Sequence, residues 1–280
     1  MGAEPRRVAV RRIVLCADDY ALSESVSRGI EALAAQARLT ATSVMVLSPR
    51  WPQDAPVLRA LRAKHPIDVG LHLDWTSPFA VAAGHGLSLE RAMLRALLGG
   101  FDRAAARAVI ERQLDAFEAH WGGPPDHVDG HQHVQQFAGI REALIEVLAA
   151  RYRAQRPWLR ISEAPSALRD AKGRVIAALG AGRLRALAAQ ADVPVVRWLA
   201  GVSDFSGGEA GFDARMRHWL AHVEDGTVLM CHPGAPGFAH DAADGIATAR
   251  EAEFRWLASD AAGAALRAPG LALVRGAEAG

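Results

Sequence analysis

Short apolar runs, each long enough for one β-strand, alternate with helical patterns along almost the whole chain of 280 residues. This alternation is typical of α/β proteins, because a helix between two strands allows the strands to run parallel. The strand candidates are residues 8–17, 42–47, 68–73, 127–129, 158–161, 193–199, 227–231 and 271–274. Eight strands with intervening helices predict an irregular (β/α) barrel of the TIM-barrel type, and a doubly wound parallel sheet is the alternative.

Two of the helical patterns can be delimited from their ends. Residues 23–36 place apolar and small side chains on one helical face, and Ser23 is a suitable N-cap. Residues 102–120 show the same spacing, with Asp102 as the cap and a Gly-Gly-Pro-Pro run that ends the segment. We therefore expect one helix in each range.

No segment has the length or composition of a separate domain. Residues 77–100 are Gly-rich and then helical, as expected for an insertion between two core strands, and residues 164–192 form the weakest connection. The length alone would allow two domains, but single β/α barrels also reach this size. We therefore predict an α/β barrel of one domain over residues 1–280, with its core at about 11–275.

The charge balance and the cysteine content argue against several partners and locations. Lys and Arg number 32 and Asp and Glu number 31, so the net charge of +1 offers no field of one sign to a nucleic acid or an acidic membrane. The two cysteines, Cys16 and Cys231, cannot form a disulfide framework. Residues 1–12 lack the apolar stretch of a signal peptide, and no apolar run approaches the length of a membrane span. We predict a cytoplasmic protein without a membrane span.

Polar residues that could carry chemistry gather where the predicted strands end. Because the carboxyl ends of parallel strands lie on one face, residues far apart in the sequence should meet there. Imidazole and carboxylate donors together suit a divalent cation such as zinc. They stand at four places: the pair Asp18-Asp19, His72 with Asp74, the run His127-x-Asp129-x-His131-x-His133, and His232. We predict a metal site on this face, although an acidic pair can also be a helix cap and a lone histidine a core residue.

Five segments, in this order, resemble the motifs of the YdjC-like carbohydrate deacetylase family. They are ADDYALS at 17–23, TATSVMV at 40–46, GLHL at 70–73, HVDGHQH at 127–133 and MCHPG at 230–234. The family includes chitooligosaccharide deacetylases and hopanoid-biosynthesis-associated deacetylases. The resemblance, which covers nearly the whole chain, implies an irregular β/α barrel and metal-dependent removal of an acetyl group from an N-acetylated sugar.

The resemblance also implies a role for each matching residue. Asp19, His72 and His131 would hold one divalent metal ion, either zinc or magnesium. Asp18 would be the catalytic base and His232 the general acid. The chemistry agrees, because hydrolysis of an unreactive amide needs an activated water, a polarised carbonyl group and a proton donor.

The N-acetylated sugar is expected to contact five further residues: Tyr20, Trp75, Asp129, His133 and Arg160. Tyr20 and Trp75 could stack on a sugar ring because they adjoin site residues, and packing in the core is the alternative. We expect no nucleic-acid partner, and a homodimer is the expected assembly.

The sequence departs from the family pattern at two places. Tyr20-Ala21 stands where the family usually has Phe-Gly, and because alanine does not easily take a positive φ, we expect the turn after Asp19 to differ. Gln135 stands where many members carry a histidine. We expect this change to affect a contact to the substrate or beside the metal ligands, and not a metal ligand.

Two other functions remain open. Another metal-dependent hydrolase, such as a phosphoesterase or an amidohydrolase acting on non-sugar amides, could use the same barrel. An amidohydrolase normally opens with His-x-His after its first strand, where this chain has Asp18-Asp19. A sugar-binding relative without turnover would have lost Asp18 or the metal ligands, and all of these positions are filled.

Overall fold

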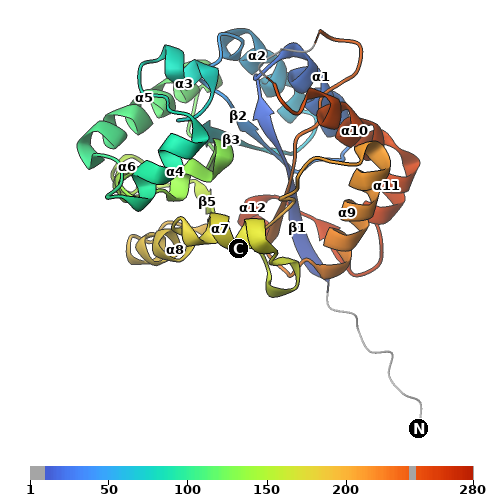
Figure 1. Cartoon of the computed structure of the whole chain (residues 1–280). Coiled ribbons are helices and arrows are strands. Elements are labelled where there is room, and N and C mark those ends of the chain that lie inside the picture. Colours follow the sequence, from blue (N-terminus) through green and yellow to red (C-terminus); the bar gives the residue numbers. More distant parts are fainter. Residues whose placement is uncertain (1–9, 240–243, 280) are drawn as a thin grey trace.

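The computed structural model describes residues 10–239 and 244–279, and its centre is a parallel sheet that curls into a nearly closed barrel (Figure 1). Eight strands follow one another in the order β6-β5-β4-β3-β2-β1-β8-β7, and β9 pairs with the start of β1. The strands are β1 (Arg11–Tyr20), β2 (Ala41–Val44), β3 (Asp68–Leu73), β4 (His127–Gly130), β5 (Trp158–Arg160), β6 (Val195–Val196), β7 (Trp198–Ala200), β8 (Thr227–Cys231) and β9 (Leu271–Leu273). The predicted irregular (β/α) barrel is confirmed.

The two ends of the sheet meet across a single residue. β6 pairs with β5 and β7 pairs with β8, and only Arg197 separates β6 from β7 in the chain. The backbone N–H of Leu199 in β7 also donates to the carbonyl oxygen of Glu163, just beyond β5 (2.8 Å). The prediction of one strand over 193–199 is therefore wrong in detail. The segment bends at Arg197, so that its two halves join opposite edges of the sheet and close the barrel.

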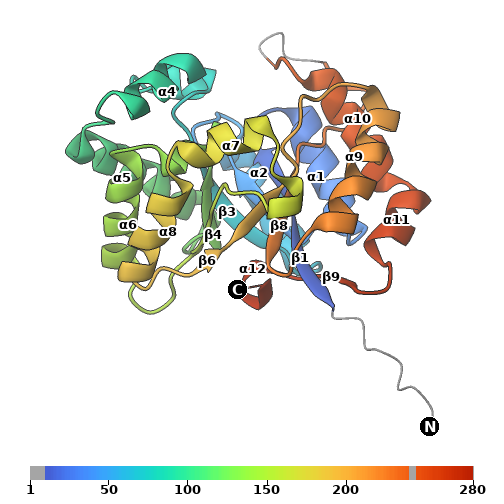
Figure 2. The ribbon, with the colours of Figure 1, turned by 60° about the horizontal axis from the view of Figure 1, so that its bottom comes forward.

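Helices surround the barrel (Figures 1 and 2). They are α1 (Glu24–Ala35), α2 (Trp51–Arg62), α3 (Pro78–Ala82), α4 (Leu89–Leu97), α5 (Arg103–Trp121), α6 (Ile140–Arg151), α7 (Ala171–Ala178), α8 (Ala181–Gln190), α9 (Gly208–His222), α10 (Ala247–Ala258), α11 (Asp260–Leu266) and α12 (Gly276–Ala279), with 3₁₀ helices η1 (His131–Gln136) and η2 (Ser166–Leu168). Within the described ranges, none of the helices combines the length and the apolar character that crossing a membrane requires. The prediction that residues 1–12 lack the apolar stretch of a signal peptide falls mostly on residues 1–9, which lie outside the described residues.

Both helices delimited from the sequence are present, and their predicted caps are confirmed. The side chain of Ser23 accepts a hydrogen bond from the backbone N–H of Val26 (3.3 Å) at the start of α1. Asp102 accepts in the same way from Ala105 (2.7 Å) at the start of α5. Gly122, with φ of 86°, ends α5 in the left-handed conformation that glycine adopts without strain. Local signals therefore define these helices.

Successive residues of β1 belong to different parts of the core. Ile13 and Leu15 pack in the large cluster that joins the strands to the helices. Val14 and Cys16 belong to a smaller cluster that includes Met230 of β8. Because side chains alternate along a strand, this smaller cluster fills the interior of the barrel. The next inward position on β1 is a carboxylate, so the barrel interior becomes polar toward the carboxyl ends of the strands.

Candidate metal and active site

A cavity of about 540 Å³ opens at the carboxyl ends of the strands. Six predicted site residues line it: Asp18, Asp19, His72, His131, His133 and His232. They come from the ends of β1, β3 and β8 and from the segment after β4. The structure therefore brings together the segments that we expected to meet at the carboxyl ends of the parallel strands.

Both carboxylates of the Asp18-Asp19 pair line the cavity, although consecutive residues of a regular strand point to opposite faces. The pairing of β1 with β2 shifts register between Ala17 and Tyr20, and Asp19 has φ of 71°. This irregularity places Asp19 on the same side as Asp18. A positive φ outside glycine costs about 1–2 kcal/mol, and such strain is typical of functional sites. Ala21 also has a positive φ, of 70°, so the turn after Asp19 has the conformation that glycine would favour, and the expected difference in this turn is not seen at Ala21.

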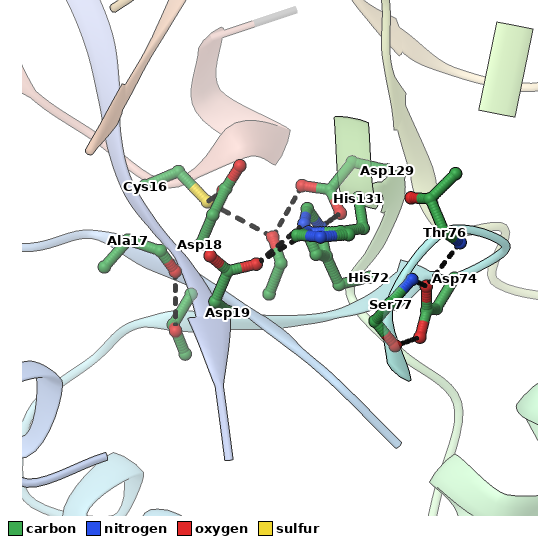
Figure 3. Close-up of polar contacts among 12 residues, drawn as sticks. Cys16, Ala17, Asp18, Asp19, His72, Asp74, Thr76, Ser77, Asp129 and His131 are labelled. Atoms are coloured by element: carbon green, nitrogen blue, oxygen red, sulfur yellow. Dashed lines mark hydrogen bonds and ion pairs between the residues drawn. The ribbon is translucent and has the colours of Figure 1, made fainter. Parts of the chain in front are cut away.

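Asp19, His72 and His131 bring three potential metal ligands together (Figure 3). The Oδ1 atom of Asp19 lies 3.3 Å from Nε2 of His72 and 3.1 Å from Nδ1 of His131. Donors bound about 2 Å from one zinc ion lie about 3–4 Å from one another, so this spacing fits a single divalent cation. Two other donor groups in the described ranges both contain Asp129, which does not line the cavity. The Asp19 group is the one of the three whose members all line the cavity.

Asp129 orients His72, which differs from its predicted contact with the substrate. Its Oδ1 lies 2.6 Å from Nδ1 of His72, and its Oδ2 pairs with Arg160 (3.1 Å). This contact turns Nε2 of His72 toward Asp19. Burial lowers the pKa of His72, but Asp129 and Asp18 outweigh it and raise the pKa to about 10. Without a metal, the contacts of His72 with Asp129 and Asp19 therefore favour its protonated form.

Arg160 holds Asp18 and does not reach the cavity. It is fully buried, and Nη1 and Nη2 each lie 2.8 Å from one carboxylate oxygen of Asp18. Burial alone would raise the pKa of Asp18, but Arg160 and His72 lower it below its ordinary value. Asp18 is therefore ionised at neutral pH. The prediction that Arg160 contacts the substrate is wrong for this arrangement, because its side chain is buried against Asp18 and does not line the cavity.

Tyr20 and Trp75 pack in the core, which was the alternative to sugar stacking. Neither residue lines the cavity, and both are buried. The hydroxyl of Tyr20 donates to Glu31 (2.9 Å), and the ring of Trp75 packs edge-on against Phe101. The prediction that these two rings bind the substrate is therefore wrong for this arrangement.

His232 and His133 both line the cavity as neutral imidazoles. The backbone N–H of His232 donates to Glu253 (2.6 Å), while its ring Nδ1 has no hydrogen-bond partner within the described ranges. Burial lowers the pKa of His232 to about 4. Nδ1 of His133 lies 3.0 Å from the hydroxyl of Ser162, and burial lowers the pKa of His133 to about 3. The ring of His232 is therefore not fixed through its Nδ1.

Arg250 is a site residue that the sequence analysis missed. It comes from α10, lines the cavity, and its Nη2 lies 2.7 Å from Oδ2 of Asp19. Its Nε donates to Asp244 (2.8 Å). Arg250 thus leaves Oδ1 of Asp19 free to face the two histidines.

Gln135 is buried away from the cavity, and its side-chain amide donates to the carbonyl oxygen of Arg160 (3.1 Å).

The same fold occurs in a solved structure. This chain is similar to the crystal structure of a putative cellobiose-phosphate cleavage protein from Enterococcus faecalis V583, with a TM-score of 0.68. The match covers 96% of this chain and 99% of that chain at 18% sequence identity. At this identity the similarity shows the fold alone.

Two proteins named carbohydrate deacetylase are similar in sequence. The human protein is 27% identical over 253 residues, which are 80% of this chain and 75% of that protein. The mouse protein is 30% identical over 151 residues, so that match spans only 50% of this chain and 47% of the mouse protein. The model of the family described as YdjC-like protein matches residues 12–268. Since this match covers most of the chain, the protein belongs to the YdjC-like family.

Proposed function

We propose that this protein is a metal-dependent carbohydrate deacetylase, which hydrolyses the acetamido group of an N-acetylated amino sugar to acetate and a free amine. The observation that carries the proposal is the convergence of Asp19, His72 and His131 beside the ionised Asp18 in one cavity. The names of the human and mouse relatives support the same activity. Such an arrangement suits hydrolysis, because the donors for a cation and a base lie together.

Asp19, His72 and His131 would hold one divalent cation. Two imidazoles and one carboxylate suit zinc by ligand type, and magnesium is the alternative that the family resemblance suggests. When bound, the cation would polarise the acetyl carbonyl group and lower the pKa of a water molecule. Asp129 and Arg250 keep His72 and Asp19 turned toward each other.

Asp18 would accept the proton of the attacking water. Its two oxygens are held by Arg160, so the carboxylate cannot rotate freely, and its lowered pKa keeps it ionised. An ionised carboxylate that does not bind the metal is the group that general-base catalysis requires. Arg160 therefore supports the reaction by positioning Asp18.

His232 would deliver a proton to the departing amine. Since the pKa of His232 is about 4, its ring is neutral at pH 7 before the reaction begins. A neutral imidazole is a very weak acid, so His232 would act as the general acid only after its ring has received a proton, and the proton that Asp18 accepts from water is the available one. In this order of steps, the C–N bond of the acetamido group breaks as its nitrogen gains that proton.

His133 would contact the substrate, because it lines the cavity without belonging to the metal-ligand group.

A cytoplasmic location and a homodimer remain predictions from the sequence. The assignment of residues 1–280 to a single domain is likewise a prediction from the sequence.

An acetate-release assay over a panel of compounds tests the proposed function. The purified protein is stripped with a chelator, reloaded with Zn²⁺ or Mg²⁺, and incubated with N-acetylated sugars, non-sugar acetamides and phosphate esters. We expect acetate from at least one N-acetylated sugar, only in the reloaded protein. Hydrolysis confined to the acetamides or phosphate esters would replace the proposal with another metal-dependent hydrolase.

A further inference from the structure

Exposed apolar side chains border the mouth of the cavity. Of the seven large apolar residues that are exposed in the described ranges, five lie on α3, α7 or α4 and its C-cap. We call these five residues the apolar rim: Val81, Leu94, Leu97, Leu98 and Val175. Leu97 is 68% exposed and Leu98 is 77% exposed, so the rim is uncovered at its tip.

The apolar rim continues the wall of the cavity. Phe79 of α3 and Met93 of α4 line the cavity, and Leu94 directly follows Met93. Val175 of α7 lines the cavity and is also 52% exposed. Figure 2 shows α4 and α7 on the side of the barrel away from the N-terminal end of β1. An apolar surface therefore extends from the cavity to the outside of the molecule.

We propose that the apolar rim docks on the surface of a lipid bilayer, with the mouth of the cavity facing the lipid headgroups. α4 has nine residues, which is too short to span a bilayer but sufficient to lie in its interface with leucines inserted. Arg91 and Arg95 of α4 are exposed, and the guanidinium carbon of Arg95 lies 5.0 Å from the ring centre of Phe101. Their guanidinium groups can reach lipid phosphates beside the inserted leucines.

The local charge matters more here than the charge of the whole chain. The net charge of +1 gives no long-range attraction to an anionic surface. Docking would depend on the inserted leucines, and the two arginines would add a preference for anionic lipid once the rim is in contact.

A second copy of this chain fits the rim less well than a bilayer does. The apolar area of the rim does not separate the two occupants, because a protein interface of about 800 Å² per partner is itself little more than half apolar. A second copy would, however, cover the mouth of the cavity together with the exposed Arg91 and Arg95, whereas a bilayer would leave the mouth open to the headgroup layer and offer phosphates to the two arginines. The rim therefore favours a lipid surface as its occupant.

Co-sedimentation of the full chain with lipid vesicles tests this proposal. Vesicles of phosphatidylcholine alone are compared with vesicles that also contain phosphatidylglycerol. The test variant is Leu97→Ser with Leu98→Ser, and the matched control is Val10→Ser with Val57→Ser, which changes two exposed valines outside the rim. We expect the wild type and the control to bind vesicles, more tightly with phosphatidylglycerol, and the leucine variant to bind at least about tenfold more weakly.

Three results would overturn the proposal. The wild type could remain in the supernatant with both kinds of vesicle, or the valine control could lose as much binding as the leucine variant. Sedimentation velocity could instead show a dimer that the leucine variant loses, with no vesicle binding, which would make the rim an interface between copies. Acetate release from a soluble substrate, measured without vesicles, should be equal in all three proteins, so a failure of docking and a failure of the proposed activity are separable.

Discussion

The guanidinium group of Arg160 contacts both carboxylate oxygens of Asp18 at 2.8 Å, and the two residues are 142 positions apart in the chain. Both side chains are buried, so the pair is shielded from water and its charges interact strongly. Arg160 also lies 3.1 Å from Asp129, which orients His72. One buried cation thus connects the candidate base to the candidate metal ligands.

Replacement Arg160→Lys should shift the acid limb of activity to higher pH. Lysine keeps the charge but cannot contact both oxygens, so the pKa of Asp18 should rise by about one unit. Because protonated Asp18 cannot act as a base, the acid limb of kcat/KM should move upward by the same amount. A pH–rate profile measures this shift, with Arg156→Lys, whose arginine contacts backbone carbonyl groups away from the site, as the control. Equal profiles for all three proteins would contradict the role of Arg160.

The limits of several strands could be predicted because their apolar runs end abruptly. The predicted strands 68–73 and 227–231 match β3 and β8 at both ends. That the segments holding Asp19, His72 and His131 meet followed from topology, because all three lie at or just after the carboxyl end of a parallel strand, whereas the choice of these three as ligands came from the family resemblance. Prediction succeeded where a local pattern and a general rule of the fold were enough.

The remaining features depend on contacts that no local pattern encodes. Arg250 pairs with Asp19 across 231 positions, and it stands among 32 basic residues without a motif to mark it. The direction of Tyr20 depends on the register shift in β1, which turns Asp19 toward the cavity and leaves the ring in the core. The bend at Arg197 depends on closure of the barrel, which involves two other strands.

Each metal ligand should be necessary for metal binding. Replacement of Asp19, His72 or His131 by alanine should reduce the metal content from about one ion per chain to nearly none, because three protein ligands leave no redundancy. His133→Ala is the control, since His133 lines the same cavity outside the ligand group. Elemental analysis of the purified proteins gives the occupancy. Full occupancy in His131→Ala would refute this assignment of ligands.

Glu253 should make the stability of the metal-free protein depend on pH. Burial raises the pKa of Glu253 from 4.5 to about 7, so its stabilising contribution is complete below pH 4.5 and is lost as the pH rises through 7. Glu253→Gln keeps an acceptor for the N–H of His232 and removes this titration. Between pH 5 and pH 8 the wild type should lose about 1–3 kcal/mol relative to the variant. Urea unfolding at the two pH values measures the difference, and parallel curves would show that Glu253 does not titrate in this range.

His232→Ala should affect an amide more than an activated ester. Loss of the proton donor should lower kcat on an N-acetylated sugar by about 10²-fold or more, since an amine departs only when protonated. An ester with a good leaving group needs no such proton, so its kcat should fall much less. Metal content should be unchanged, because His232 is outside the ligand group. Equal losses on the two substrates would assign the proton transfer to another group.

The most direct test of the account is the replacement Asp18→Asn, with metal content and acetate release measured on the same sample. Asparagine is nearly the same size, and Asp18 does not belong to the Asp19 group of ligands. We expect about one metal ion per chain, as in the wild type, and a fall in acetate release of about 10²–10⁴-fold from loss of the base. Full turnover with the metal in place would contradict it, because Asp18 would then serve only to shape the end of β1.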